Sequence, residues 1–280
     1  MPEIINQVFY PSSTNELCND WNKVPDAIIF GGGVSRLKKQ TDRLFLLPKA
    51  LLSMDNIGEL RKIDRTERYL EIGSMVNLNR IALLGKIVPE ALSLSLKSTG
   101  TFLLRNLMTV GSCICKRSTT EPLIASLVAL DSRYEFKTEN SSRWISASYF
   151  STVPDKEDIF HFHEYLARIR IPLEIWHYTH CRDFSTKESG DSGNEFAVFL
   201  ARMQKDILCE LRLIFSGTSI LRDRESELTL IGKKLPLDKK TISNFIEIWE
   251  ERLGTIKDRS EFQKAKLLNF IDSAIHYFAY

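Results

Sequence analysis

The sequence has few cysteines, and none of them forms a C-x-x-C pair. The five cysteines stand at positions 18, 113, 115, 181 and 209, without the four closely spaced thiolates that an iron–sulfur cluster usually requires. Two histidine pairs, at 161 and 163 and at 177 and 180, lack carboxylates or thiolates at metal-ligand spacing. We therefore expect reduced thiols, no disulfide framework and no metal on this chain.

Long apolar runs and an excess of one charge are also missing. No run approaches the roughly 18 apolar residues that a membrane span needs, and residues 1–13 lack the basic and apolar segments of a secretory signal. The chain has 38 Lys and Arg against 36 Asp and Glu, a net charge of +2, which gives no whole-chain electrostatic case for nucleic acid binding. These absences predict a cytoplasmic protein with no membrane span and no nucleic acid partner.

The composition that remains is typical of a globular protein. Of 280 residues, 43% are hydrophobic and 26% are charged. At roughly 150 residues per domain, this length predicts two domains. The pairing of Ser13 with Glu16 predicts the start of a helix, and the continuous apolar run at 27–30 predicts a strand buried on both faces.

Strand and helix patterns also alternate in the rest of the chain. Apolar residues occupy every second position from Ile207 to Phe215, which predicts a strand over 207–215. Ser118 and Glu121 form a second capping-box pattern ahead of the apolar run at 123–130. Apolar residues then repeat at helical spacing in two segments near the carboxyl end. This mixture predicts an α+β fold.

A triple glycine directly follows the apolar run at 27–30. Gly31, Gly32 and Gly33 leave several backbone N–H groups unshielded by side chains, and such a loop can supply the donors that a pyrophosphate needs. The pattern is neither G-x-G-x-x-G nor a P-loop. The alternative is a plain turn, since glycine serves wherever a positive φ is required.

A second candidate loop is Thr109-Val110-Gly111-Ser112-Cys113. A Gly-Ser pair flanked by small hydrogen-bonding side chains can bring a second stretch of backbone to the same ligand. The alternative is a strand bulge or a tight bend.

The two glycine segments, in this order and spacing, resemble the flavin-binding medium subunits of the molybdenum hydroxylases, the xanthine dehydrogenase and carbon monoxide dehydrogenase family. Phe9-Tyr10-Pro11 and the helix after it resemble the family's opening, and residues 27–34 resemble its strand and first flavin loop. Residues 104–114, LRNLMTVGSCI, resemble the segment IRNxATIGGNI.

This resemblance implies an α+β fold with two domains. Residues 1–175 would form a two-part α/β FAD-binding domain, with subdomains at about 1–52 and 53–175. Residues 176–280 would form a smaller domain, a three-stranded antiparallel sheet with helices.

The resemblance also implies a cofactor site for FAD. The first loop would hold the pyrophosphate through Gly31, Gly32, Gly33, Val34 and Ser35. The second would hold the cofactor through Thr109, Gly111, Ser112 and Cys113. The next helix would add a polar contact, at Ser118 and Glu121.

The implied function is an electron-transfer subunit of a xanthine dehydrogenase-like oxidoreductase. It would take electrons from a two-iron two-sulfur small subunit, beside a molybdopterin-binding large subunit, and pass them to an external acceptor. No catalytic acid, base or nucleophile is expected, because the flavin carries the redox chemistry. Val34, Cys113 and Pro122 depart from the family's pattern, and they motivate the alternative of a flavin-free homologue that acts as a structural or assembly subunit.

Overall fold

The computed structural model describes residues 7–33, 48–153, 159–185, 195–257 and 259–279. It divides into two compact units. The first comprises the described residues within 1–89, 99–118 and 130–173, and the second comprises those within 90–98, 119–129 and 174–280. The chain therefore crosses between the units several times.

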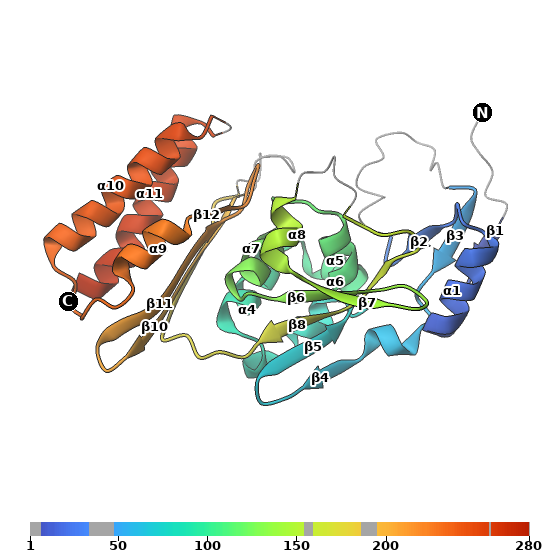
Figure 1. The fold of residues 1–280 in the computed structure, drawn as a ribbon. Coiled ribbons are helices and arrows are strands. Elements are labelled where there is room, and N and C mark those ends of the chain that lie inside the picture. The colour runs from blue at the N-terminus through green and yellow to red at the C-terminus, as the bar shows by residue number, and fades with distance from the viewer. Residues whose placement is uncertain (1–6, 34–47, 154–158, 186–194, 258, 280) are drawn as a thin grey trace. The chain divides into compact units, whose positions relative to one another are not determined.

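A small parallel sheet opens the first unit (Figure 1). Its strands are β1 (Gln7–Phe9), β3 (Ala50–Ser53) and β2 (Ile28–Phe30), in the order β1-β3-β2. The predicted strand is present as β2, but its burial on both faces was wrong, because β2 is an edge strand with Ile28 exposed and the next two residues half-buried. Helix α1 (Thr14–Lys23) begins where predicted, since the Ser13 hydroxyl accepts the Glu16 amide. The Glu16 carboxylate accepts the amide of Ser12 rather than that of Ser13, so the reciprocal half of the capping box is shifted by one residue.

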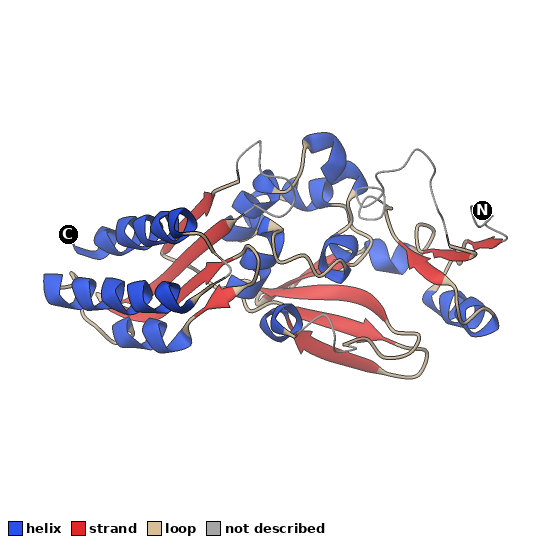
Figure 2. Ribbon diagram, turned by 90° about the horizontal axis from the view of Figure 1, so that it is seen from above, coloured by secondary structure: helices blue, strands red, loops and turns tan. Residues whose placement is uncertain are grey.

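A five-stranded antiparallel sheet forms the rest of the first unit's strand structure (Figure 2). In sheet order its strands are β4 (Ile63–Arg65), β5 (Tyr69–Gly73), β8 (Tyr165–Pro172), β6 (Arg133–Lys137) and β7 (Ser142–Ser146). The helical elements of this unit are α3 (Leu78–Ala82), α5 (Phe102–Leu107), α6 (Val110–Cys115), α8 (Ala147–Thr152), η1 (Gly58–Arg61) and η2 (Gly85–Ile87). Together with these helices, the two sheets confirm the predicted α+β class.

Residues 73–76, which we call the junction segment, tie these elements together. The Gly73 amide donates to Lys62, the Ser74 amide to Ala167 and the Met75 amide to Leu60. A Cβ placed on Gly73 would lie 2.2 Å from the carbonyl oxygen of Leu60, a distance that non-bonded atoms do not reach. Only glycine therefore lets the end of β5 run so close to η1.

The second unit is built on a four-stranded antiparallel sheet. Its order is β12 (Leu221–Arg222), β11 (Ile207–Phe215), β10 (Phe196–Gln204) and β9 (Tyr178–Asp183). The expected sheet had three strands, and the two-residue β12 is a fourth at the edge. The strand predicted at 207–215 is present with the same bounds.

Helices cover both faces of this sheet, which explains why residues 196–201 of β10 are all buried. Trp249 and Phe270, on two long helices, belong to one apolar core with Phe215 of β11. The helices of this unit are α4 (Glu90–Ser98), α7 (Pro122–Ala129), α9 (Arg224–Leu230), α10 (Lys239–Thr255), α11 (Glu261–His276) and η4 (Tyr277–Ala279). This unit confirms the expected antiparallel sheet with helices.

Helix α7 begins later than its sequence pattern predicts. Its first residue is Pro122, so Ser118 lies four residues ahead of the helix rather than at its N-cap. Proline suits the first helical position, because its fixed φ is already helical and an N–H group there has no helical partner. All eight residues of α7 are buried.

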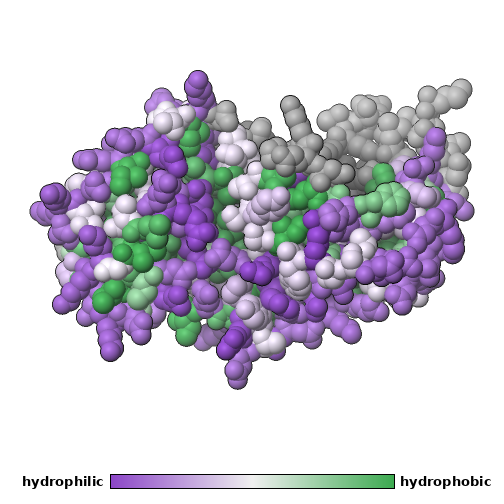
Figure 3. Space-filling view, in the orientation of Figure 1, coloured by the Kyte–Doolittle hydropathy of each residue, from purple (hydrophilic) through white to green (hydrophobic). Residues whose placement is uncertain are grey.

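No helix in the described part of the chain is long and apolar enough to cross a membrane. Hydrophilic residues occupy most of the face drawn in Figure 3. The apolar side chains are mainly collected in the interior of each unit.

The junction segment gives a first prediction. Gly73→Ala is expected to lower the free energy of unfolding by about 1–3 kcal/mol, the usual effect of overpacking, because the new methyl group would push β5 away from Leu60. Urea denaturation measures this change. Gly58→Ala is the matched control, since a Cβ there meets nothing within 4 Å, and its effect should stay within about 0.5 kcal/mol. Equal stability of the two variants would show that β5 and η1 separate at little cost.

Candidate functional site

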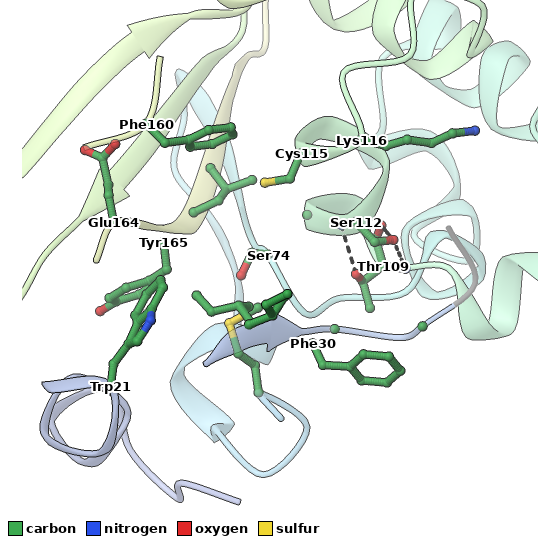
Figure 4. A pocket seen from close by; sticks show the side chains of 17 residues that line it. Trp21, Phe30, Ser74, Thr109, Ser112, Cys115, Lys116, Phe160, Glu164 and Tyr165 are labelled. Atoms are coloured by element: carbon green, nitrogen blue, oxygen red, sulfur yellow. Dashed lines mark hydrogen bonds between the residues drawn. The ribbon is translucent and has the colours of Figure 1, made fainter. Parts of the chain in front are cut away.

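A pocket of about 540 Å³ lies inside the first unit (Figure 4). Its walls come from the end of β2 with the triple glycine, from Thr109 and α6, and from residues 160–166 at the start of β8. Trp21 and Ser74 complete the wall. The volume falls within the range of about 300–1,000 Å³ that is usual for small-molecule and cofactor sites.

The triple glycine forms one edge of this pocket. Gly32 has φ +67°, a left-handed backbone conformation, and a Cβ on it would lie 2.5 Å from the carbonyl oxygen of Leu107. A side chain at this position would therefore be strained and would collide with backbone. Gly31 and Gly33 line the pocket itself.

The backbone amides of this glycine loop are the groups through which it could bind an anion. Among the hydrogen bonds of the described residues, none is donated by the N–H groups of Gly31, Gly32 or Gly33. Backbone amides that lack side-chain shielding and face a pocket are the donors that bind phosphate oxygens. The loop thus has the chemistry expected of a pyrophosphate cradle.

The second glycine segment has a different local structure. It is neither a bulge nor an open loop, because it begins helix α6, and Thr109 is the N-cap residue. The Thr109 hydroxyl accepts the Ser112 amide at 3.1 Å, and the Ser112 hydroxyl accepts the Thr109 amide at 3.2 Å. This reciprocal capping box fixes both side chains at the pocket wall.

The backbone amides of the second segment are already used inside the protein. The Gly111 amide donates to Ser74 at 2.8 Å, and the Cys113 amide donates to Thr109 at 3.2 Å. A Cβ on Gly111 would lie 2.8 Å from the carbonyl oxygen of Ser74, so glycine is needed here for close packing against the junction segment. The second segment therefore shapes the pocket rather than offering it free amides.

The structure brings five of the sequence-predicted residues together at this pocket: Gly31, Gly33, Thr109, Gly111 and Ser112. Gly32 and Cys113 belong to the same two segments, but they are not among the described residues that line it, and Cys113 is buried. Ser118 and Glu121 are likewise absent from that lining. Val34 and Ser35 lie outside the described residues.

Several lining residues carried no recognisable sequence signal. Glu164 is a buried carboxylate that accepts two hydrogen bonds from Arg143, each 2.6 Å long. Burial opposes its ionisation, but the Arg143 guanidinium and the His161 amide outweigh that effect and hold the pKa of Glu164 below its usual value. Glu164 is therefore a charged wall residue whose partner is already present.

Tyr165 and Cys115 are uncharged at neutral pH. Burial raises the pKa of Tyr165 to about 12, which keeps the phenol protonated. Cys115 is exposed within the pocket, yet the surrounding protein removes water from the thiol and raises its pKa to about 12. Trp21 stacks on His163 with 4.8 Å between ring centroids. These residues come from segments far apart in the chain, so no spacing motif could have revealed them.

A metal site is not part of this arrangement. The described residues contain no group of three or more His, Cys, Asp or Glu that could hold a metal ion. The pocket instead combines apolar side chains, such as Ile28, Ile29 and Phe160, with Gly31 and Gly33 of one glycine loop. An elongated cofactor that contains both a diphosphate and flat apolar rings fits this combination.

These features describe a cofactor-sized pocket edged by glycines, and comparison with known proteins identifies the family. Residues 4–174 match the family model described as the FAD binding domain in molybdopterin dehydrogenase. The match covers more than half of the chain, and the chain belongs to this family. No curated protein sequence gave a significant match.

Solved structures agree in fold over nearly the whole chain. A chain of quinoline 2-oxidoreductase from Pseudomonas putida 86 matches with a TM-score of 0.79 and 20% identity, covering 100% of this chain and 96% of that one. A chain of carbon monoxide dehydrogenase from Hydrogenophaga pseudoflava, in a form that lacks the Mo-pyranopterin moiety, gives 0.80 and 18%, covering 99% and 98%. Reconstituted CO dehydrogenase from Oligotropha carboxidovorans gives 0.79 and 18%, covering 100% and 99%.

Family membership confirms the resemblance drawn from the two glycine segments. It also confirms FAD as the expected cofactor and an oxidoreductase component as the expected class of protein. The cofactor role of each individual residue remains a prediction.

The glycine loop gives the second prediction. Gly32→Val is expected to weaken FAD binding at least a hundredfold, because its side chain meets the Leu107 carbonyl and forces the loop out of its left-handed conformation. FAD titration, followed by quenching of flavin or tryptophan fluorescence, measures this change.

Gly85→Val is the matched control for Gly32→Val. Gly85 also has a positive φ, +62°, but a Cβ there meets nothing within 4 Å. Both variants carry backbone strain and should melt earlier than the parent, yet only the Gly32 variant should lose FAD. Cys113→Ala should change the affinity only modestly, since its thiol is buried outside the pocket lining. Parental affinity in folded Gly32→Val would mean that the loop is only a turn.

Proposed function

We propose that this chain is the FAD-binding electron-transfer subunit of a molybdenum hydroxylase complex. It receives electrons from a two-iron two-sulfur partner subunit, which is reduced by a molybdopterin-binding large subunit, and it passes them to an external acceptor. The observation that carries the proposal is the first glycine loop, of which Gly31 and Gly33 line an apolar pocket of cofactor size, with amides that no described residue accepts.

The residues at this pocket have complementary roles. Gly31, Gly32 and Gly33 donate backbone N–H groups to the diphosphate, with Val34 and Ser35 continuing the loop. Phosphate carries negative charge, and several convergent amides offset the loss of its hydration. Gly32 lets the loop adopt its left-handed conformation beside the Leu107 carbonyl, where a side chain would collide.

The second segment positions the cofactor mainly by shape. Gly111 allows α6 to pack against the junction segment, and Thr109 and Ser112 present their capped side chains to the pocket. Cys113 supports this wall from behind. The polar contact expected from Ser118 and Glu121 stays a prediction of the family resemblance, since neither residue lines the pocket. This segment therefore contributes to cofactor binding mainly by packing, since its backbone amides already have partners within the protein.

FAD, when bound, supplies reversible two-electron chemistry that no amino-acid side chain provides. The chain contributes position and exclusion of water. Trp21 and Phe160 offer flat apolar faces to a ring system, and stacked aromatic contacts stabilise such rings. Tyr165 stays protonated because its pKa is raised to about 12, so it meets the ligand as a neutral hydrogen-bonding group.

The domain division and the partners belong to the same proposal. The family match ends at residue 174, which supports an FAD-binding domain over 1–175, in two parts at about 1–52 and 53–175, and a C-terminal domain over 176–280. The molybdenum cofactor named for the Hydrogenophaga enzyme supports a molybdopterin-binding partner. A flavin-free structural subunit is the alternative, which is favoured by the full internal use of the second segment's amides.

The direct test is FAD titration of the purified chain. We expect one FAD per chain, a retained yellow absorbance after gel filtration, and a higher melting temperature with the cofactor. At a free FAD concentration of 100 times Kd, the expected stabilisation is about 2.7 kcal/mol. Absence of binding would leave the flavin-free alternative as the better description.

A footprint of Cys115 tests where FAD binds. Its thiol lines the pocket and has a pKa of about 12, so alkylation should be slow and should speed up about tenfold per pH unit between pH 8 and 11, as the reactive thiolate forms. At pH 9, saturating FAD should slow the labelling of Cys115 at least fivefold, as measured by peptide mass spectrometry. Cys209 in the second unit is the internal control. Equal protection of both thiols, or of neither, would contradict FAD binding in this pocket.

A further inference from the structure

One buried hydroxyl in the pocket wall has no partner. Ser74 follows the last residue of β5 and is 1% exposed. Its amide donates to Ala167, and its carbonyl accepts from Gly111. Its Oγ has no hydrogen-bond partner in the part of the chain that the structure describes. Figure 4 shows this hydroxyl at the wall of the pocket, between the glycine loop and α6.

Buried hydroxyls normally find a partner within the protein. The hydroxyl of Ser126 donates to the Ala91 carbonyl, and the hydroxyl of Ser95 donates to the Leu92 carbonyl. An alanine at position 74 would keep every backbone hydrogen bond of the junction segment without leaving a hydroxyl unpaired. The serine is therefore unexplained by the fold itself, and its position in the pocket lining points to a ligand.

The surroundings of Ser74 indicate which part of the cofactor it meets. The next residue, Met75, lies against the glycine loop, since a Cβ on Gly31 would be 2.9 Å from its sulfur. On the other side, Ser74 packs against Gly111. The Ser74 side chain thus stands beside Gly111, in the pocket that Gly31 and Gly33 of the first loop also line.

We propose that the Ser74 hydroxyl is a direct hydrogen-bond contact to bound FAD, at the diphosphate or at the ribityl oxygens next to it. The inference rests on the proposed function, because it assigns one further residue to the same site. A hydroxyl can donate to a phosphate oxygen and can both donate to and accept from a ribityl hydroxyl. The contact would satisfy a group that the protein alone leaves unpaired.

The test compares Ser74→Ala with Ser132→Ala. Ser132 is the matched control, because it is also fully buried in the first unit with an unpartnered hydroxyl, but it does not line the pocket. Ser74→Ala should bind FAD about 3–10-fold more weakly, the usual effect of losing one hydrogen bond. Ser132→Ala should bind FAD like the parent. The readouts are FAD titration and thermal melting with and without FAD.

The two states of the protein should respond differently to this change. Without FAD, Ser74→Ala should melt at or above the temperature of the parent, because an unpaired buried hydroxyl has been removed. With FAD, its melting temperature should rise less than that of the parent. Ser74→Cys, which replaces a strong donor by a weak one, should fall between the two and serves as a second variant if the alanine variant misfolds.

Shorter ligands locate the contact. ADP carries the diphosphate and FMN carries the ribityl phosphate, so a weaker binding of ADP to Ser74→Ala assigns the contact to the diphosphate, and a weaker binding of FMN alone assigns it to the ribityl side. Parental FAD affinity in Ser74→Ala, with the parent binding FAD, would overturn this contact and leave the proposed function intact. A parent that does not bind FAD would overturn both.

Discussion

The pocket depends on the close approach of helix α6 to the end of strand β5. Gly111 has no side chain, so its amide can reach the carbonyl of Ser74 at 2.8 Å, and the Val110 amide can reach Val76 at 2.9 Å. The same junction segment is bound on its other sides to Leu60, Lys62 and Ala167. The junction segment therefore holds η1, strand β8 and the second glycine segment in fixed positions relative to one another. Because buried amides must be paired, these contacts also determine which donors remain for a ligand.

The two glycine segments serve different physical purposes, although both look like loops in the sequence. No described residue accepts a hydrogen bond from the amides of Gly31, Gly32 or Gly33, and Gly31 and Gly33 line the pocket, which suits an anion. The amides of the segment from Thr109 to Cys113 donate hydrogen bonds within the N-terminal cap of α6 and to the junction segment. Ser112 and Cys113, where this chain differs from the family segment IRNxATIGGNI, thus lie in a stretch that shapes the pocket by packing and offers no free backbone donor. The substitutions there are compatible with a pocket that still has an intact first loop.

The strongest sequence predictions concern features with a local cause. The Ser13 cap, the strand after residue 27 and the strand at 207–215 follow from capping chemistry and from apolar periodicity. The start of α7 could not be placed in the same way. Ser118 and Glu121 carry the spacing of a capping box, but the helix begins at Pro122. The capping-box spacing predicts a start after Ser118, whereas proline favours the first helical position because its φ is already helical, and the helix starts at the proline.

By itself, the sequence determined the α+β class, the family through its two glycine segments, and FAD as the cofactor, because these depend on residue order and on glycine's lack of a side chain. Only the tertiary structure decided which amides of the two glycine segments have partners within the protein, since the acceptors of the Val110 and Gly111 amides lie in the distant junction segment. It also placed Trp21, Ser74 and Glu164 in one wall. Trp21 lies on α1, Ser74 follows β5 and Glu164 precedes β8, so no sequence spacing relates them. They line one pocket only because these elements pack together.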